Sequence, residues 1–326
     1  MLGAGSWGTA LAMLIARNGA TVRLWDVDSG HVADLGRHRE NARYLPGIPF
    51  PDTLELREEI GSAIEDSSGV LIVVPSHAFR ATVERIAASP AAGAVSLVAW
   101  GTKGFDQTRS VLLSEVVAEL LPDAVRAVIS GPSFAAEVAH GLPTALTVAA
   151  DAPGAARVVS GWLRCDHVRV YTNDDLAGVQ LGGAIKNVMA VAAGISDGLG
   201  FGANARAALI TRGLAEMNRL GVALGGKPQT FMGLTGVGDL ILTCTDNQSR
   251  NRRAGIGLGQ GQSLEEVLTQ IGQEVEGVKT VHELYGMAKR LGVDMPITEQ
   301  VYRVVYEGLP PGKAVEILLN REPKSE

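Results

Sequence analysis

One lysine stands in an otherwise apolar stretch of small residues. Lys186 lies within residues 181–194, which read Leu-Gly-Gly-Ala-Ile-Lys-Asn-Val-Met-Ala-Val-Ala-Ala-Gly. Burial of an ammonium group without a partner is costly and usually lowers its pKa, so that it can exchange protons near neutral pH. A lysine on the polar side of a helix would instead extend its head group to water. The segment predicts a proton-transfer residue, with a solvated helix lysine as the alternative.

The amino terminus carries a G-x-G-x-x-G pattern. Gly3, Gly5 and Gly8 are its glycines, with Ser6 and Trp7 between them, and a helix-forming run follows at residues 9–16. Such glycines permit a tight turn and a close approach to a pyrophosphate, and the helix amino terminus favours the negative charge. The pattern predicts dinucleotide binding, with a glycine-rich turn without ligand as the alternative.

A second expected strand, residues 21–25, ends at Asp26. An acidic residue at this distance from the glycines can accept a hydrogen bond from a ribose 2′-hydroxyl. Only Met1 and Leu2 precede the motif, where a complete first strand is expected. Either the start is truncated or the central strand is very short.

Two glycine-containing loops follow expected strands. Lys103 lies in Gly-Thr-Lys-Gly at 101–104, and Gly131 and Ser133 lie in Gly-Pro-Ser-Phe at 131–134. Because ligands bind at the carboxyl ends of parallel strands, Lys103 is a candidate for an anion contact and Ser133 for one at a helix start. A solvated lysine and an ordinary helix cap explain the same residues.

Two further loops carry polar side chains in the second half. Asp239 follows a glycine-punctuated segment and could orient Lys186 or cap a helix. Ser249, Arg250 and Asn251 belong to a donor-rich run, and the arginine fork suits phosphate. A solvated basic turn is the alternative for this run.

Composition narrows the class of protein. The chain has 326 residues, 46% of them hydrophobic, and a formal net charge of −6. This length suits two domains, and the acidic balance argues against a broad nucleic-acid surface while leaving room for a small anion. With no basic-apolar leader and no long uncharged apolar run, we expect a cytoplasmic protein without membrane insertion.

Cysteine and histidine are sparse. Cys165 and Cys244 are far apart, which predicts buried free thiols rather than a disulfide. The six histidines are dispersed without ligand spacing, so no metal site is expected.

Short apolar runs alternate with amphipathic stretches up to about residue 172. This order predicts an α/β, Rossmann-type, doubly wound parallel sheet, with strands at 70–74, 95–100, 127–130 and 145–149. After it, Asn173 or Asp174 is expected to cap a helix, and convincing strands cease. We therefore expect a dinucleotide-binding domain at 1–173 and an all-helical substrate and catalytic domain at 174–326.

Taken together, these segments resemble the bacterial NAD(P)-dependent glycerol-3-phosphate dehydrogenases over essentially the whole chain. Besides the motifs above, the resemblance rests on Tyr44-Leu45-Pro46-Gly47, Val74-Pro75-Ser76-His77, Ala193-Gly194-Ile195-Ser196-Asp197-Gly198, Gly202-Ala203-Asn204-Ala205 and Val275-Glu276-Gly277. It implies reduction of dihydroxyacetone phosphate to sn-glycerol 3-phosphate, the backbone of glycerophospholipids, by NADH or NADPH without a metal. A homodimer and inhibition by the product are further implications.

The resemblance also implies roles for single residues. Lys186 would donate the proton in reduction and accept it in the reverse reaction. The implied substrate residues are Lys103, Gly131, Ser133, Lys186, Asp239, Ser249, Arg250 and Asn251. The implied cofactor residues, with the fingerprint glycines and Asp26, are Ser6, Trp7, Lys103, Ala135, Arg250 and Glu276.

The residue after Asp26 bears on the choice of cofactor. NADP-using members of the resembled family often have arginine or histidine there, whereas this chain has Val27. Asp26 would also repel a 2′-phosphate, so we expect NADH to be used at least as well as NADPH, although Arg37 and Arg39 could reach the adenosine end. Two other functions stay open: a related dehydrogenase acting on another small phosphorylated or acidic substrate, and a dinucleotide sensor without turnover.

Overall fold

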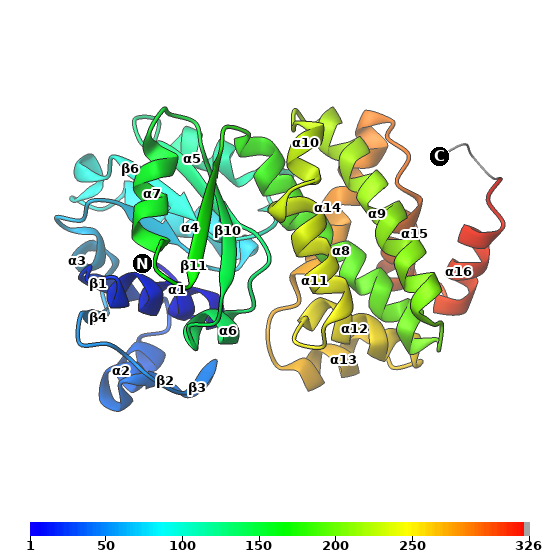
Figure 1. The fold of residues 1–326 in the computed structure, drawn as a ribbon, viewed down its shortest axis with the longest axis horizontal. Helices are drawn as coiled ribbons and strands as arrows, with labels where there is room; N and C mark the ends of the chain where they lie inside the picture. The colour runs from blue at the N-terminus through cyan, green and yellow to red at the C-terminus, as the bar shows by residue number, and fades with distance from the viewer. Residues whose placement is uncertain (323–326) are drawn as a thin grey trace. The chain divides into compact units, whose positions relative to one another are not determined.

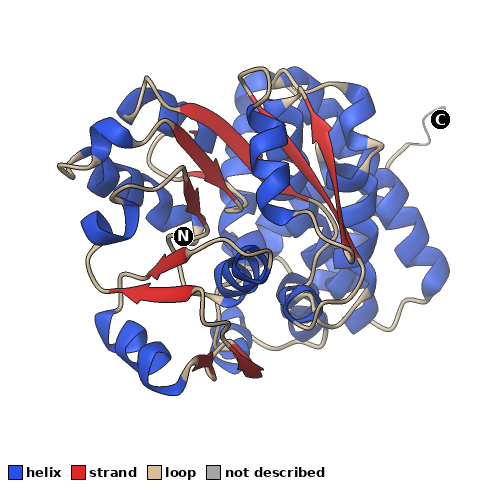
Figure 2. Ribbon diagram, turned by 60° about the vertical axis from the view of Figure 1, so that its left-hand side comes forward, coloured by secondary structure: helices blue, strands red, loops and turns tan. Residues whose placement is uncertain are grey.

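The structure is a computed structural model and describes residues 1–322. The chain divides into two compact units, Met1–Gln180 and Leu181–Glu326 (Figure 1). The first unit contains the strands and the second is helical (Figure 2), which confirms the expected fold class. The compact units divide inside one helix, and the domain boundary at 173/174 stays a prediction.

The main sheet of the first unit has five strands in the order β11-β10-β9-β6-β5. Parallel pairing joins β5 to β6, β6 to β9 and β10 to β11, whereas β10 runs antiparallel to β9. The expectation of a parallel sheet is therefore correct for β5, β6 and β9, whereas β10 and β11 run in the opposite direction. The strands are β5 (Val70–Ile72), β6 (Leu97–Trp100), β9 (Val125–Ser130), β10 (Thr144–Ala150) and β11 (Val168–Asn173).

The place of the first strand is taken by the residues before Gly3. Leu2 forms parallel bridges to Trp25 on one side and to Ile72 on the other. Its N–H donates to the Leu71 carbonyl at 2.8 Å, and the Gly3 N–H donates to the Trp25 carbonyl at 2.8 Å. In the sequence given, Leu2 therefore holds the place of the central strand, and it connects the main sheet to the parallel pair β1 (Val22–Trp25) and β4 (Leu54–Arg57).

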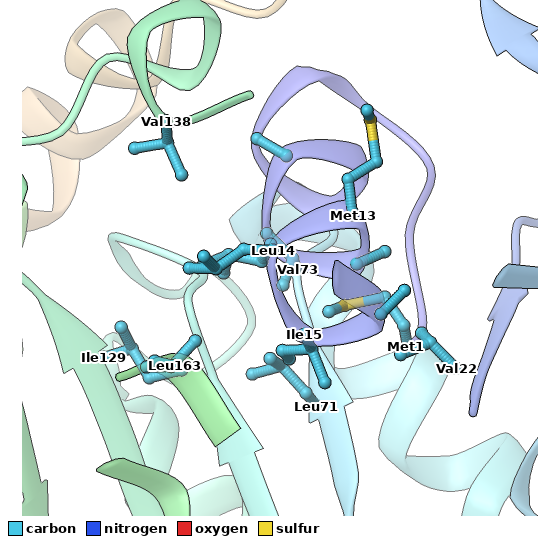
Figure 3. Close-up of a cluster of buried hydrophobic side chains, with 14 of the residues drawn as sticks. Met1, Met13, Leu14, Ile15, Val22, Leu71, Val73, Ile129, Val138 and Leu163 are labelled. Carbon is cyan, nitrogen blue, oxygen red and sulfur yellow. The ribbon is translucent and has the colours of Figure 1, made fainter. Parts of the chain in front are cut away.

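Helices cover the sheet because the strands are apolar and buried. All residues of β5 and β6 are buried, as expected of strands with helices on both faces. Around the first helix, Leu14 and Ile15 pack among Leu71, Ile129 and Leu163 (Figure 3). The helices of this unit are α1 (Ser6–Arg17), α2 (Ser29–His38), α3 (Ile60–Ile64), α4 (Ser76–Ala87), α5 (Leu113–Leu120), α6 (Ala135–Ala139) and α7 (Ala155–Leu163), and the remaining short strands are β2 (Glu40–Asn41), β3 (Leu45–Pro49), β7 (Phe105–Asp106) and β8 (Val111–Leu112).

The second unit has no strand among its described residues. Its long helices are α8 and α9, and α8 begins in the first unit. The elements are α8 (Leu176–Gly198), α9 (Ala203–Ala223), α10 (Pro228–Phe231), a π-helical turn (Leu234–Gly238), α11 (Asp239–Thr245), α12 (Arg250–Gly259), α13 (Leu264–Ile271), α14 (Glu276–Leu291), α15 (Pro296–Tyr306) and α16 (Pro311–Leu319).

The start of α8 differs from the expected cap. The Asp175 carboxylate accepts the Gly178 N–H at 2.8 Å, so the cap lies just after Asn173 and Asp174. By length and composition α8 could cross a membrane, but 89% of its most apolar window is buried inside the protein. Such burial is typical of the core helix of a water-soluble protein.

A buried glutamate holds the start of α15. Glu216 on α9 is 1% exposed, and its carboxylate accepts the N–H of Ile297 at 2.5 Å and the N–H and hydroxyl of Thr298 at 3.1 and 3.0 Å. These bonds satisfy donors that the first turn of a helix leaves without partners. Burial outweighs them and raises the pKa of Glu216 to about 7.

This pKa predicts a pH dependence of stability. Because the folded pKa of about 7 exceeds the ordinary value of 4.5, protonation of Glu216 favours the folded state, and this stabilisation is lost as pH rises through the folded pKa of about 7. The free energy of unfolding of the wild type should therefore gain on the order of 3 kcal/mol more than that of Glu216→Gln between pH 7 and 4.5. Urea denaturation of both proteins across this range measures the difference. Parallel pH profiles would contradict the prediction.

Candidate active site

Lys186 forms a buried cluster with two residues of α11. Its side chain lies on α8, the residue is 6% exposed, and its Nζ donates to the Asp239 carboxylate and to Thr243 Oγ1, the latter at 2.8 Å. Asp239 is 1% exposed, and the Thr243 hydroxyl donates to its backbone carbonyl at 2.6 Å. Of the two alternatives that the sequence left open, the solvated helix lysine is therefore excluded, and the buried lysine has partners. A buried ammonium held by two oxygens is a well-oriented proton donor.

Glycines allow α8 to approach the turn before α11 closely. A Cβ on Gly182 would lie 2.7 Å from the Thr235 carbonyl oxygen, and one on Gly236 would lie 1.9 Å from the Phe231 carbonyl oxygen. Neither position can accept a side chain without movement of the backbone. The contact at Gly182 brings the glycine-punctuated segment, and Asp239 directly after it, against α8 one turn before Lys186. Residues 234–238 of this segment form a π-helical turn, a feature that often occurs at functional sites.

Thr243 and Asn187 are polar residues of this site that the sequence reasoning did not select. Thr243 follows Asp239 by four positions, which puts both on one face of α11. That spacing was the signal available for it. Asn187 adjoins Lys186 and accepts a hydrogen bond from Asn251 Nδ2 at 2.9 Å.

The predicted anion-binding residues lie at the start of α12. Ser249 caps this helix by accepting the Arg252 N–H at 3.1 Å, and Arg250 donates to Gln273 at 3.3 Å. Asn251 Oδ1 accepts the Gly277 N–H at 2.9 Å, next to Glu276 at the start of α14. Asn251 thus bonds to both Asn187 and Gly277. These three residues directly follow Arg250, Lys186 and Glu276 in the sequence, so the three predicted site residues adjoin one hydrogen-bonded network.

Neither cysteine takes part in a disulfide. Burial raises the pKa of Cys244 to about 12, which makes it an inert thiol beside the lysine cluster. The expectation of two buried thiols was wrong for Cys165, which is only partly buried. The turn at residues 164–167 that carries it is too exposed to enclose a side chain.

The fingerprint glycines are required by their surroundings. Gly3 has a φ of +109°, and a Cβ there would lie 2.6 Å from the Val73 carbonyl oxygen. A Cβ on Gly8 would lie 2.0 Å from the Gly3 carbonyl oxygen. Gly5 immediately precedes α1, whose amino terminus therefore opens at the loop. The geometry is that of a dinucleotide-binding turn.

Asp26 lies beside this loop, at the end of β1. Its Oδ2 accepts the Ala4 N–H at 2.7 Å, which fixes the carboxylate against the fingerprint. Val27 is 70% exposed. Arg37 pairs with Asp34 on its own helix, and Arg39 donates to the backbone carbonyls of Pro51 and Leu54 further along the chain, so both guanidinium groups have partners within the first unit.

Trp7 provides a test of whether the turn fits a cofactor. Its Nε1 is buried and has no hydrogen-bond partner among the described residues, and a Cβ on Gly101 would lie 2.9 Å from it. A buried donor without a partner costs free energy unless a ligand satisfies it. The residues present therefore fit a dinucleotide that offers an acceptor beside α1.

The loops after β6 and β9 carry the other predicted residues of this unit. Lys103 is partly buried in the first loop, where the Thr102 hydroxyl donates to the Val74 carbonyl at 2.8 Å. In the second, Gly131 has a φ of +125° and its carbonyl accepts the Ser133 hydroxyl at 3.0 Å. Ala135 begins α6. Both loops follow strand ends, as a ligand site in such a sheet requires.

A large cavity lies elsewhere in the second unit. It has a volume of about 1420 Å³ and is lined by parts of α9, α15 and α16, including Leu209, Glu216 and Val304. None of the predicted site residues lines it. We place the candidate active site at Lys186 because its chemistry, rather than the size of a cavity, identifies it.

Comparison with known proteins assigns the family. The family described as "NAD-dependent glycerol-3-phosphate dehydrogenase N-terminus" matches residues 1–156, and its C-terminal counterpart matches residues 175–316. The chain belongs to the NAD-dependent glycerol-3-phosphate dehydrogenase family.

Similar members of this glycerol-3-phosphate dehydrogenase family cover the whole chain. A glycerol-3-phosphate dehydrogenase [NAD(P)+] of Methylococcus capsulatus is 56% identical over 100% of this chain and 97% of its own length. One of Pseudoalteromonas translucida is 55% identical over 100% and 97%. The crystal structure of the Coxiella burnetii glycerol-3-phosphate dehydrogenase has a TM-score of 0.94 at 48% identity and covers 98% of each chain. The resemblance noted from the motifs is thereby confirmed.

Proposed function

We propose that this chain is an NAD(P)-dependent sn-glycerol-3-phosphate dehydrogenase that reduces dihydroxyacetone phosphate. Membership of the family over the full chain supports the reaction. The observation that carries the proposal is the Lys186 ammonium, buried and held by Asp239 and Thr243 in the unit that also contains Arg250. A dinucleotide sensor would have no use for a proton donor held in this way.

Lys186 is proposed to deliver the proton to the ketone oxygen. A reduced nicotinamide supplies the hydride to the carbonyl carbon when bound. Asp239 stabilises the positive charge of Lys186 before transfer, and Thr243 fixes the direction of Nζ. In the reverse reaction the neutral amine accepts the proton from the hydroxyl, as microscopic reversibility requires.

The phosphate of the substrate is proposed to bind Ser249, Arg250 and Asn251. Arg250 offers a planar fork for two phosphate oxygens. Ser249 accepts the Arg252 N–H through a lone pair, so its hydroxyl hydrogen can donate to an anion. Lys103, Gly131 and Ser133 are proposed to contribute to the same substrate.

The cofactor is proposed to bind at the fingerprint. Gly3, Gly5, Ser6, Trp7 and Gly8 would form the pyrophosphate turn, and Asp26 would accept from a ribose hydroxyl. Lys103, Ala135, Arg250 and Glu276 complete the proposed contacts. A homodimer, a cytoplasmic location, product inhibition and a role in glycerophospholipid synthesis belong to the same proposal.

Spectrophotometric assay of NADH and NADPH oxidation tests the function. Purified protein should oxidise the cofactor with dihydroxyacetone phosphate and far less with dihydroxyacetone, which lacks the phosphate. A mixture without substrate is the control. Oxidation only with another small acid or sugar phosphate would assign a related dehydrogenase, and cofactor binding without any turnover would assign a sensor.

The choice between cofactors gives a separate prediction. The wild type should use NADH at least as well as NADPH, because Asp26 repels a 2′-phosphate and exposed Val27 offers it no cation. Val27→Arg should raise kcat/KM for NADPH by about tenfold or more, the effect of a charged hydrogen bond, with little change for NADH. Steady-state kinetics with both cofactors measures this ratio.

Val158→Arg is the matched control, because Val158 is also an exposed valine of the first unit. It adds the same charge away from the fingerprint and should leave the ratio unchanged. A strong NADPH preference of the wild type, or an unchanged ratio in Val27→Arg, would contradict the proposed discrimination.

A further inference from the structure

Arg252 is a buried arginine that the proposed reaction does not use. Its side chain is 9% exposed, although it follows the proposed phosphate-binding residues 249–251 directly. Its Nε donates to the Cys244 carbonyl at 3.1 Å, one terminal nitrogen donates to Asn247 Oδ1, and the other donates to Asp197 Oδ2 at 2.5 Å. One guanidinium therefore ties together the end of α11, the loop before α12 and the end of α8.

Asp197 anchors this connection on the helix that carries Lys186. It is a charged partner for two arginines, since Arg206 on α9 donates to both of its oxygens at 3.0 and 2.9 Å. The Arg206 side chain is 29% exposed, whereas that of Arg252 is almost fully enclosed. The pair with Arg252 is thus the less solvated of the two, and less screened by water.

The backbones of α8 and α12 touch at the same place. A Cβ on Gly194 would lie 2.1 Å from the Arg252 carbonyl oxygen, and one on Gly255 would lie 2.1 Å from the Val191 carbonyl oxygen. Gly198 and Gly259 repeat the contact one turn later. The helices therefore lie at backbone distance, and a small displacement of α12 along α8 cannot be absorbed by side chains between them.

Neighbouring arginines on α12 point in different directions. Successive residues of a helix are rotated by about 100°, so Arg250 and Arg252 lie on different faces. Arg252 is buried, Arg250 is partly buried and Arg253 is exposed. The Ser249 hydroxyl caps the same turn by accepting the backbone N–H of Arg252. The inward arginine consequently fixes the first turn from which Arg250 and Asn251 extend.

We propose that Arg252, through Asp197, is a positioning residue that sets the place of Ser249, Arg250 and Asn251 relative to Lys186. Its effect falls on affinity for the phosphate of the substrate, because the side-chain bonds described for Arg252 are to Cys244, Asn247 and Asp197 and not to the Lys186 cluster itself. The inference rests on the proposed function. It assigns a role in that site to Arg252, which is proposed to touch neither substrate nor cofactor.

The test compares KM with kcat in variants of this ion pair. Arg252→Met should raise KM for dihydroxyacetone phosphate at least about tenfold and change kcat by less than about threefold, as expected when ground-state and transition-state binding weaken equally. The inhibition constant of inorganic phosphate, used as a competitive probe, should rise in parallel. Asp197→Asn should give the same pattern more weakly, and Arg252→Lys, which keeps the charge, should lie between Arg252→Met and the wild type. Arg253→Met is the control on the same helix and should behave as the wild type.

The outcomes separate this inference from the function on which it rests. An active wild type with unchanged KM and phosphate inhibition in Arg252→Met would overturn the inference alone, as would equal losses of kcat and affinity. If Arg252→Met does not fold, Arg252→Lys and Asp197→Asn decide the same question in the same assay. A folded wild type that does not turn over dihydroxyacetone phosphate would overturn both.

Discussion

Lys186→Ala should lower turnover of dihydroxyacetone phosphate by at least about a hundredfold, because it removes the proton donor to the ketone. Binding of NADH should persist, since the fingerprint lies in the other compact unit. The variant leaves Asp239 buried without its cation, so it should unfold more easily than the wild type. Turnover is therefore measured at low temperature, with circular dichroism to confirm the fold and fluorescence titration to follow NADH.

Lys289→Ala is the matched control for this experiment. Lys289 lies on α14 of the same unit and is exposed, so its loss should leave turnover unchanged. Near-normal turnover by folded Lys186→Ala would refute the proton-transfer assignment. An added small primary amine that restores part of the activity would support it.

Asp239→Leu should lower the free energy of unfolding by about 3–5 kcal/mol, the cost of leaving a buried charge without its partner. Lys186 is enclosed in the folded protein and would lose the carboxylate that balances its charge, while its bond to the Thr243 hydroxyl would remain. The double variant Lys186→Met/Asp239→Leu removes both charges and should recover most of this stability, although both variants should be inactive. Urea denaturation of the two single variants and the double variant forms a cycle that measures the coupling.

A surface pair provides the comparison. Lys313 and Glu316 are each 55% exposed, so Glu316→Leu should change stability little. Strict additivity of the two single losses in the double variant would show that Lys186 and Asp239 are not coupled, and would contradict the buried ion pair.

The elements of the first unit could be predicted from the sequence because their signals are local. Short apolar runs gave the strands, and the spacing of Gly3, Gly5 and Gly8 gave the turn before α1. The reversal of β10 and the bridges of Leu2 to Trp25 and Ile72 could not be read in this way, since strand direction and pairing depend on contacts between distant segments.

In the second unit, too, contacts between distant segments at the candidate site could not be predicted from the sequence. Lys186 and Asp239 were both marked by their neighbours, but their pairing joins residues 53 positions apart. Thr243 carries no signal beyond its spacing from Asp239, and Arg252 is one of several arginines of the donor-rich run. Only the packing of α8 against α11 and α12 gives them their partners. The cap of α8 was expected just before Asp175 because Asn173, Asp174 and Asp175 all have side chains suited to capping.

The bridging position of Leu2 has a consequence for cooperativity. The pair β1–β4 and the five-stranded sheet would be separate folding units if they shared only loops, but backbone hydrogen bonds on both sides of Leu2 join them. Local opening of one must then break bonds to the other. The parts of the proposed dinucleotide site that follow β1 and those that follow β6 should therefore be protected from hydrogen exchange to a similar degree, and a bound cofactor would stabilise them as one unit.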